Sequence, residues 1–142
     1  MKCVSIVILC SCIAFLNGCV SPQAQAEERA DNRKRMKEAI ELCDMTYVVS
    51  CNNRAIVVYK DADGVERTAD CSYGEDWFYW VNNPSPGQVF QLSVRVTYVN
   101  PQEGEPMVSA KIYSHGKLIK DDTKVGATAT YAFVMTWCNR QE

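Results

Sequence analysis

Residues 90–98 read Phe-Gln-Leu-Ser-Val-Arg-Val-Thr-Tyr, and this stretch decides the class of the fold. Every second side chain from Phe90 to Tyr98 is apolar, and the side chains between them are polar. Successive side chains of a strand point to opposite faces of a sheet, so a period of two indicates a strand with one face buried. The sequence therefore predicts a strand at this position.

The same alternation recurs along the chain. Residues 131–137 place Tyr131, Phe133, Met135 and Trp137 on one face of a strand and smaller side chains on the other. A period of two in many short runs favours strands over helices. The further strands are expected at residues 45–51, 54–60, 66–71, 76–82 and 107–114.

Turn residues separate these stretches. Asp61-Ala62-Asp63-Gly64 and His115-Gly116 suit hairpin connections, because glycine adopts the positive φ that such turns require. Prolines mark two longer loops, at residues 82–87 and 100–106. About seven strands over residues 45–142 predict an all-β fold, an immunoglobulin-like β-sandwich preceded by one N-terminal helix.

The first segment of the chain, residues 1–18, is typical of an export signal. Lys2 precedes an apolar run that ends at Leu16, and the small residue Gly18 precedes Cys19. The run is shorter than the roughly 20 residues that a transmembrane helix needs. Residues 16–19 fit the cleavage site of a bacterial lipoprotein, so we expect Cys19 to become the acylated N-terminus, carrying for example palmitate. An ordinary signal peptide cut nearby is the alternative.

Two short segments connect the lipid site to the strands. Residues 19–26 predict a tether, and residues 27–44 predict a helical spacer, because residues 27–42 hold good helix formers and no Gly or Pro. The apolar stripe of this helix is narrow and confined to its second half, which favours a solvated helix that docks only its last turns. Its members are Met36, Ala39, Ile40 and Cys43.

Cysteine usage indicates an oxidising compartment. Of the eight cysteines, three leave with the signal and Cys19 would carry the lipid. An even number in an exported chain predicts two disulfides, whereas a zinc site is disfavoured because no pair is spaced C-x-x-C. The cysteines that remain are Cys43, Cys51, Cys71 and Cys138.

Four cysteines allow three pairings, and the strand order favours one of them. If the first three strands form a meander, Cys51 and Cys71 end at the same pole and Cys43 lies at the opposite pole. Cys138 meets Cys43 if the last strand runs antiparallel to the first. Cys51–Cys71 with Cys43–Cys138 is then the pairing in which no cysteine crosses the domain.

Composition and motifs argue against an enzyme and against a nucleic-acid binder. The 15 basic and 17 acidic residues give a formal net charge of −2, so no basic surface is indicated. His115 is the only histidine, and its place at a hairpin tip favours a turn residue over a general base. Asp61, Asp63, Asp121 and Asp122 lack the ligand spacing of an EF-hand loop. We therefore expect no catalytic residues, no bound metal and no cofactor.

Trp77-Phe78-Tyr79-Trp80 is the strongest candidate for a binding patch. In a strand these side chains alternate, so Trp77 and Tyr79 cannot share a face with Phe78 and Trp80. One pair should enter the core and the other should lie at the surface, where exposed aromatics suit a peptide, glycan or lipid. The alternative is that the tether, the helix or a loop covers them.

Several of these stretches resemble the mycobacterial small membrane protein family MmpS. Residues 55–64 are similar to its second strand and turn, and residues 110–120, with Gly126 and the strand ending at Cys138, are similar to its last hairpin and strand. The resemblance covers about residues 46–138. It implies a small immunoglobulin-like β-sandwich held at a membrane, where MmpS members assist a large transporter in exporting lipids or siderophores.

The leading expectation is a lipid-anchored, non-enzymatic envelope protein that binds or supports another envelope component, such as a transporter. Val20 lacks the aspartate that holds many enterobacterial lipoproteins at the inner membrane, so by resemblance the outer membrane is favoured. The alternative is a periplasmic inhibitor of a secreted enzyme such as lysozyme. An inhibitor would insert residues 82–87 or 100–106 into a cleft, the latter loop offering Glu103 and Glu105.

Overall fold

A computed structural model describes residues 21–72 and 74–138 of the chain. The expected signal peptide, Cys19 and the first residues of the expected tether lie outside the described residues. The described elements are α1 (Pro22–Leu42), β1 (Met45–Cys51), β2 (Arg54–Lys60), β3 (Glu66–Cys71), β4 (Asp76–Val81), β5 (Val89–Tyr98), β6 (Met107–Ser114), β7 (Lys117–Val125) and β8 (Tyr131–Trp137).

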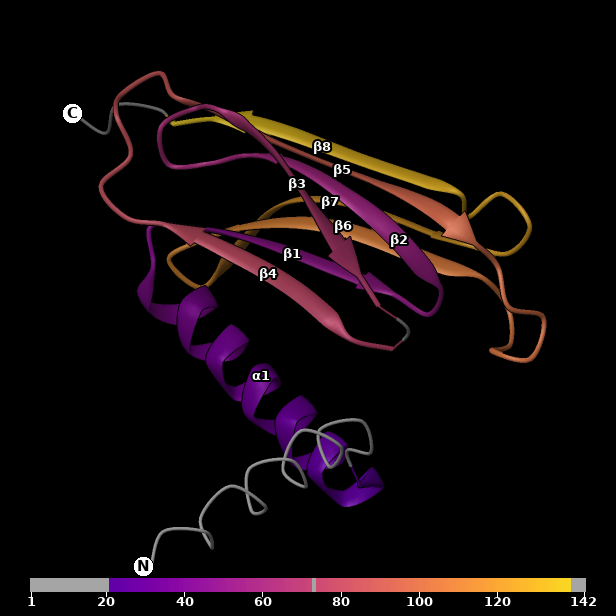
Figure 1. Ribbon diagram of the computed structural model, residues 1–142. Helices are drawn as coiled ribbons and strands as arrows, with labels where there is room; N and C mark the ends of the chain where they lie inside the picture. The colour runs from indigo at the N-terminus through magenta and orange to yellow at the C-terminus, as the bar shows by residue number, and fades with distance from the viewer. Residues whose placement is uncertain (1–20, 73, 139–142) are drawn as a thin grey trace, which may run out of the picture. The chain divides into compact units, whose positions relative to one another are not determined.

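The strands form two four-stranded sheets that face each other (Figure 1). Sheet A has the strand order β4-β1-β6-β7, and sheet B has the order β3-β2-β5-β8. Every neighbouring pair is antiparallel. The all-β class predicted from the alternation is therefore confirmed.

One core fills the space between the sheets, and the alternation of β5 accounts for much of it. Phe90, Leu92 and Val94 are completely buried and meet Tyr47 of β1 and Ile112 of β6. Each such side chain contributes about 1.5–3 kcal/mol when it leaves water. The predicted inward face of β5 is thus confirmed over its first half, whereas Tyr98 lies past the core and is exposed.

The described residues contain eight strands, one more than the seven ranges expected from the sequence. The strand that the expected ranges leave out is β7, the second arm of the hairpin predicted at His115-Gly116, and its sequence Lys-Leu-Ile-Lys-Asp-Asp-Thr-Lys-Val carries charges along most of its length. It lies at the edge of sheet A and pairs only with β6. Charged side chains are tolerated there because they reach water and discourage pairing with another chain.

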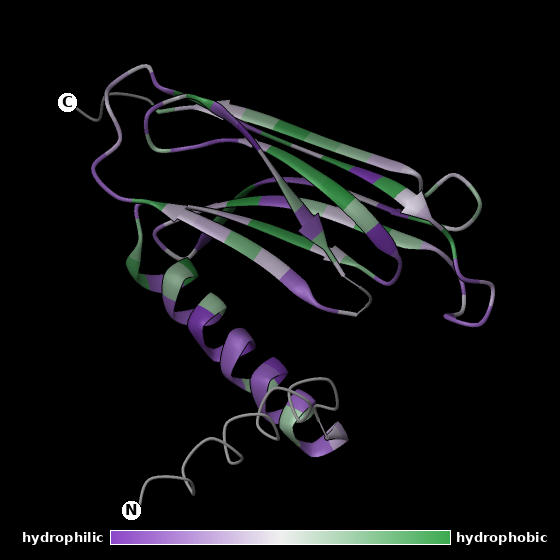
Figure 2. Ribbon diagram, viewed as in Figure 1, coloured by the Kyte–Doolittle hydropathy of each residue, from purple (hydrophilic) through white to green (hydrophobic). Residues whose placement is uncertain are grey.

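Helix α1 begins earlier than the sequence predicted, at Pro22 instead of residue 27. The Ser21 hydroxyl accepts a hydrogen bond from the backbone N–H of Ala24 at 3.2 Å. A serine cap followed by proline in the first turn is a favourable helix start. Residues 22–26, expected in the tether, are therefore helical. The helix is mostly hydrophilic (Figure 2).

The second half of α1 is bound to sheet A. The Thr46 hydroxyl donates to the carbonyl of Ala39 at 3.0 Å, and the Asn32 amide donates to the carbonyl of Asp76 at 2.9 Å. Thr46 and Val48 are buried although they point away from the core, so β1 is covered on both faces. The contact reaches from Asn32 to the end of the helix, further than the narrow apolar stripe predicted.

Candidate functional site

Strand β8 turns its larger apolar side chains to the surface. Ala132 and Val134 point into the core, where the inner side of β8 lies against β6 and β7. The larger side chains therefore lie on the outer face of sheet B. These four residues, which we call the β8 row, are exposed as follows: Tyr131 44%, Phe133 39%, Met135 42% and Trp137 58%.

The β8 row forms a sizeable apolar surface. A large side chain carries on the order of 200 Å² of surface, so the row exposes roughly 350 Å² in total. Contiguous apolar patches of about 300–600 Å² are the largest that ordinary monomers expose, and they are often functional. The row is therefore a candidate binding surface.

A hollow of about 200 Å³ lies beside the β8 row on the same sheet face. The register of sheet B places Ile56, Arg95 and Tyr131 in one row across β2, β5 and β8. Val58 and Ser93 occupy the next row, and Thr68 of β3 lies opposite Val58. The hollow therefore combines an aliphatic floor, an aromatic ring, two hydroxyls and a guanidinium group.

The open edge of β8 is closed by side chains of β7. The Asp122 carboxylate accepts a hydrogen bond from the backbone N–H of Phe133 at 2.9 Å, and the Lys124 ammonium donates to the carbonyl of Tyr131 at 2.8 Å. The hydrogen bond from Phe133 is the main reason why the pKa of Asp122 lies below its usual value. These contacts oppose the addition of a further strand along this part of the edge, so β8 presents a face and not an edge.

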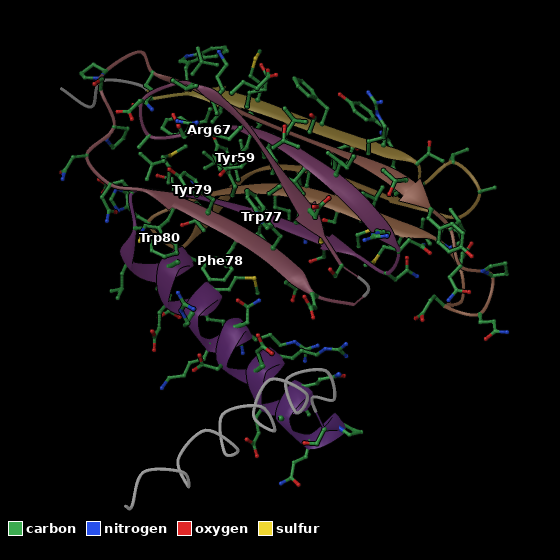
Figure 3. All side chains as sticks on the ribbon, in the orientation of Figure 1. Tyr59, Arg67, Trp77, Phe78, Tyr79 and Trp80 are labelled. Atoms are coloured by element: carbon green, nitrogen blue, oxygen red, sulfur yellow. The ribbon has the colours of Figure 1, made fainter. Side chains whose placement is uncertain are left out.

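The predicted aromatic patch divides between the two sides of β4, as the alternation requires (Figure 3). Trp77 and Tyr79 point inward, and each ring centroid lies 4.8 Å from that of Tyr59. Phe78 and Trp80 point outward and stack with centroids 5.7 Å apart. Of the four, only Trp80 is exposed, at 42%, and the other three are partly buried, so this surface is smaller than the β8 row.

Cys51 ends β1 and Cys71 ends β3, but no two of the described cysteines lie at disulfide-bonding distance. Cys51 and Cys71 are both buried in the core at one end of the sheets. Burial, helped by the nearby Cys51 thiol, raises the pKa of Cys71 to about 12. Cys138 packs against the same core at the other end, whereas Cys43 is buried at the end of α1.

His115 lies at the tip of the β6–β7 hairpin with a positive φ of 44°. Its Nε2 atom lies 3.4 Å from Oδ1 of Asp44, a contact that the sequence did not reveal because Asp44 precedes β1. The neighbouring Gly116 donates its N–H to the carbonyl of Ile40 at 2.7 Å and so caps the last turn of α1. The hairpin tip therefore serves to hold the helix.

The four aspartates considered for calcium do not gather at one place. Asp61 accepts hydrogen bonds from the backbone N–H groups of Asp63 and Val65 and from the Arg67 guanidinium, which lies 2.8 Å away. The hydrogen bond from Arg67 is the main reason why the pKa of Asp61 is lowered. Asp121 and Asp122 lie on β7 instead. Asp61 thus stabilises the turn between β2 and β3.

Sequence reasoning missed the hollow and the outward direction of the β8 row, although a signal was present. Strands β2 and β8 are apolar on both faces, since Ala55 and Val57 alternate with Ile56 and Val58. Such a strand must expose one apolar face unless another layer covers it.

Comparison with protein families and with curated proteins finds no match. No helix within residues 21–138, residue 73 aside, is long and apolar enough to span a bilayer.

Proposed function

We propose that the chain is a lipid-anchored, non-enzymatic envelope protein whose immunoglobulin-like β-sandwich binds another envelope component through the β8 row. One observation carries the proposal: large apolar side chains line the outer face of sheet B, while α1 covers part of the outer face of sheet A. Leaving such side chains in water is unfavourable, and a bound component would remove that cost.

The N-terminal sequence supports the anchor. Acylation of Cys19 would fix the domain to a bilayer, with the outer membrane as the favoured site, and α1 would space the domain from it. A transporter, as the MmpS resemblance implies, is one such component. Mass spectrometry of the mature protein tests the anchor, because an unmodified N-terminal residue would exclude it.

The binding proposal is tested on the full-length protein. A C-terminally tagged protein is crosslinked in cells, extracted from detergent-solubilised membranes and purified, and the bound protein and glycan are analysed. We expect a stable component with the parent protein and a several-fold loss with the double variant Phe133→Ser and Trp137→Ser. Leu118→Ser is the control, because Leu118 is about as exposed as Phe133 but lies on β7. Recovery of the domain alone, under gentle and crosslinked conditions alike, would refute the proposal.

We also propose a disulfide between Cys51 and Cys71 in an oxidising compartment. Both thiols lie in the same core cluster, and the Cys51 thiol adds to the effect of burial in raising the pKa of Cys71. The second expected bridge, Cys43–Cys138, stays a prediction. It rests on the positions of the two residues, since Cys43 lies just before the start of β1 and Cys138 just after the end of β8. Peptide mapping without reduction identifies whichever bridges form.

Inhibition of a secreted enzyme is the second candidate, and one loop favours it. The Asn52 amide donates to the carbonyl of Glu105 at 2.7 Å, and the Asn53 side chain accepts from the N–H of Asn100 at 2.9 Å. These bonds fix residues 100–106 in advance, which lowers the entropy cost of entering a cleft. A lysozyme assay decides this, since absence of inhibition at micromolar excess would remove the candidate.

A further inference from the structure

The hollow on the outer face of sheet B has the chemistry of a site for an acidic sugar. We propose that it binds one carboxylate-bearing sugar unit of an envelope polysaccharide. This inference rests on the proposed function, because it names the class of component that the β8 row would meet. Three features of the hollow support it: its charge, its mixture of apolar and hydroxyl groups, and its size.

Charge comes from Arg95, which is exposed in the middle of the sheet face. In the described part of the chain no hydrogen bond or ion pair occupies its guanidinium group. Asp70 lies in the same row of the sheet, beyond Ile56, and does not pair with it. A guanidinium group offers two parallel N–H donors that match a carboxylate. The hollow therefore favours an anion.

The remaining lining suits a sugar ring. A pyranose ring is apolar across its C–H face and polar at its hydroxyl groups. Tyr131 offers an aromatic face, and Ile56 and Val58 offer aliphatic contact. Ser93 and Thr68 offer hydroxyls that both donate and accept hydrogen bonds. The hollow thus offers a partner for the carboxylate, the C–H face and the hydroxyl groups of a carboxylated sugar.

Size favours one unit of a polymer over a large ligand or a second copy of this chain. The hollow holds about 200 Å³, less than the roughly 300–1,000 Å³ of a typical ligand pocket. The β8 row continues from Tyr131 to Trp137 over about 20 Å, which gives neighbouring units a platform. Its exposed area is well below the roughly 800 Å² per partner that a stable dimer buries.

The test uses the full-length purified protein and isothermal titration with oligogalacturonate, an acidic oligosaccharide. The methyl-esterified oligosaccharide is the neutral control ligand. We expect binding to the acidic form, with at least a tenfold loss on esterification and a similar loss in Arg95→Gln. Arg54→Gln is the control variant, because Arg54 is exposed at the start of β2 but does not line the hollow. It should leave the affinity unchanged.

Each other outcome is informative. Absence of binding to the acidic form, equal binding to the ester, or equal losses in Arg54→Gln and Arg95→Gln would overturn the sugar site. If the crosslinked component is then still recovered from membranes, and still lost in the Phe133 and Trp137 variant, the proposed function stands without it. If neither experiment detects binding, both proposals fail.

Discussion

Substitutions at Val134 and Met135, neighbours in β8, test the orientation of this strand. Val134 is 5% exposed in the core, whereas Met135 is 42% exposed on the outer face. Val134→Thr keeps the shape of the side chain but buries a hydroxyl, and Met135→Gln keeps the length of the side chain but adds an amide in contact with water. The two changes therefore differ mainly in whether the new polar group is desolvated.

The expected magnitudes follow from these exposures. A buried hydroxyl without a partner costs about 1–3 kcal/mol of unfolding free energy. A polar group at an exposed position usually changes it by about 0.5 kcal/mol or less. In a domain of this size 1 kcal/mol lowers Tm by roughly 4–8 °C, so Val134→Thr should be clearly resolved and Met135→Gln barely so.

Thermal and urea unfolding followed by circular dichroism measure both variants. The urea m-value should stay at the parent's value, so that the midpoint reports stability alone. If Met135→Gln lowers Tm more than Val134→Thr does, then the larger side chains of β8 face the core. That result would remove the β8 row and with it the proposed binding surface.

Three further predictions concern turns, loops and bridges. The hydrogen bond from Arg67 is the main reason why the pKa of Asp61 is lowered, so Asp61 adds stability above its unfolded pKa of about 3.9, and this stability is lost as the pH falls through the lower folded pKa. In urea titrations at pH 7 and pH 3, Asp61→Asn should therefore lose less stability at the acid pH than the parent protein does. An unchanged pH dependence would refute this role of Asp61. Asn53→Ala removes a buried amide side chain and leaves the partly buried N–H of Asn100 unpaired, so it should cost about 1–3 kcal/mol in the same assay, whereas a cost near zero would contradict the fixed loop. A Cys51–Cys71 bridge should contribute about 3 kcal/mol, so reduction should lower Tm more in the parent protein than in Cys71→Ser, which keeps the expected Cys43–Cys138 bridge, and an equal fall would show that the Cys51–Cys71 bridge does not form.

How far the sequence predicts the fold depends on the strand. Strand β5 has an apolar row and a polar row, so its alternation shows which face is buried, and the structure agrees. Strand β8 has two apolar rows, and alternation alone cannot choose between them. The smaller row, Ala132 and Val134, enters the core because β6 and β7 lie against it, and that packing is a tertiary property.

The candidate site was less predictable than the fold. Trp77 to Trp80 were found because adjacent aromatics are visible in one stretch, and their alternation gave the correct division. The hollow joins Ile56, Arg95 and Tyr131, which come from three strands that are separated in the chain. No spacing rule reveals the order β2-β5-β8 in advance. The contact of His115 with Asp44 was missed for the same reason.

Oxidation of Met135 tests the central claim most directly, because it reports whether the β8 row is exposed and whether something covers it. Dilute hydrogen peroxide is applied to the purified full-length protein and to intact envelopes, and sulfoxide formation is followed by mass spectrometry. Met45 is buried at 6% exposure and serves as the internal control.

We predict that Met135 oxidises quickly in the purified protein and several-fold more slowly in envelopes, while Met45 stays protected in both. Slow oxidation in the purified protein would show that the row faces inward. Equally fast oxidation in envelopes would show that nothing binds it.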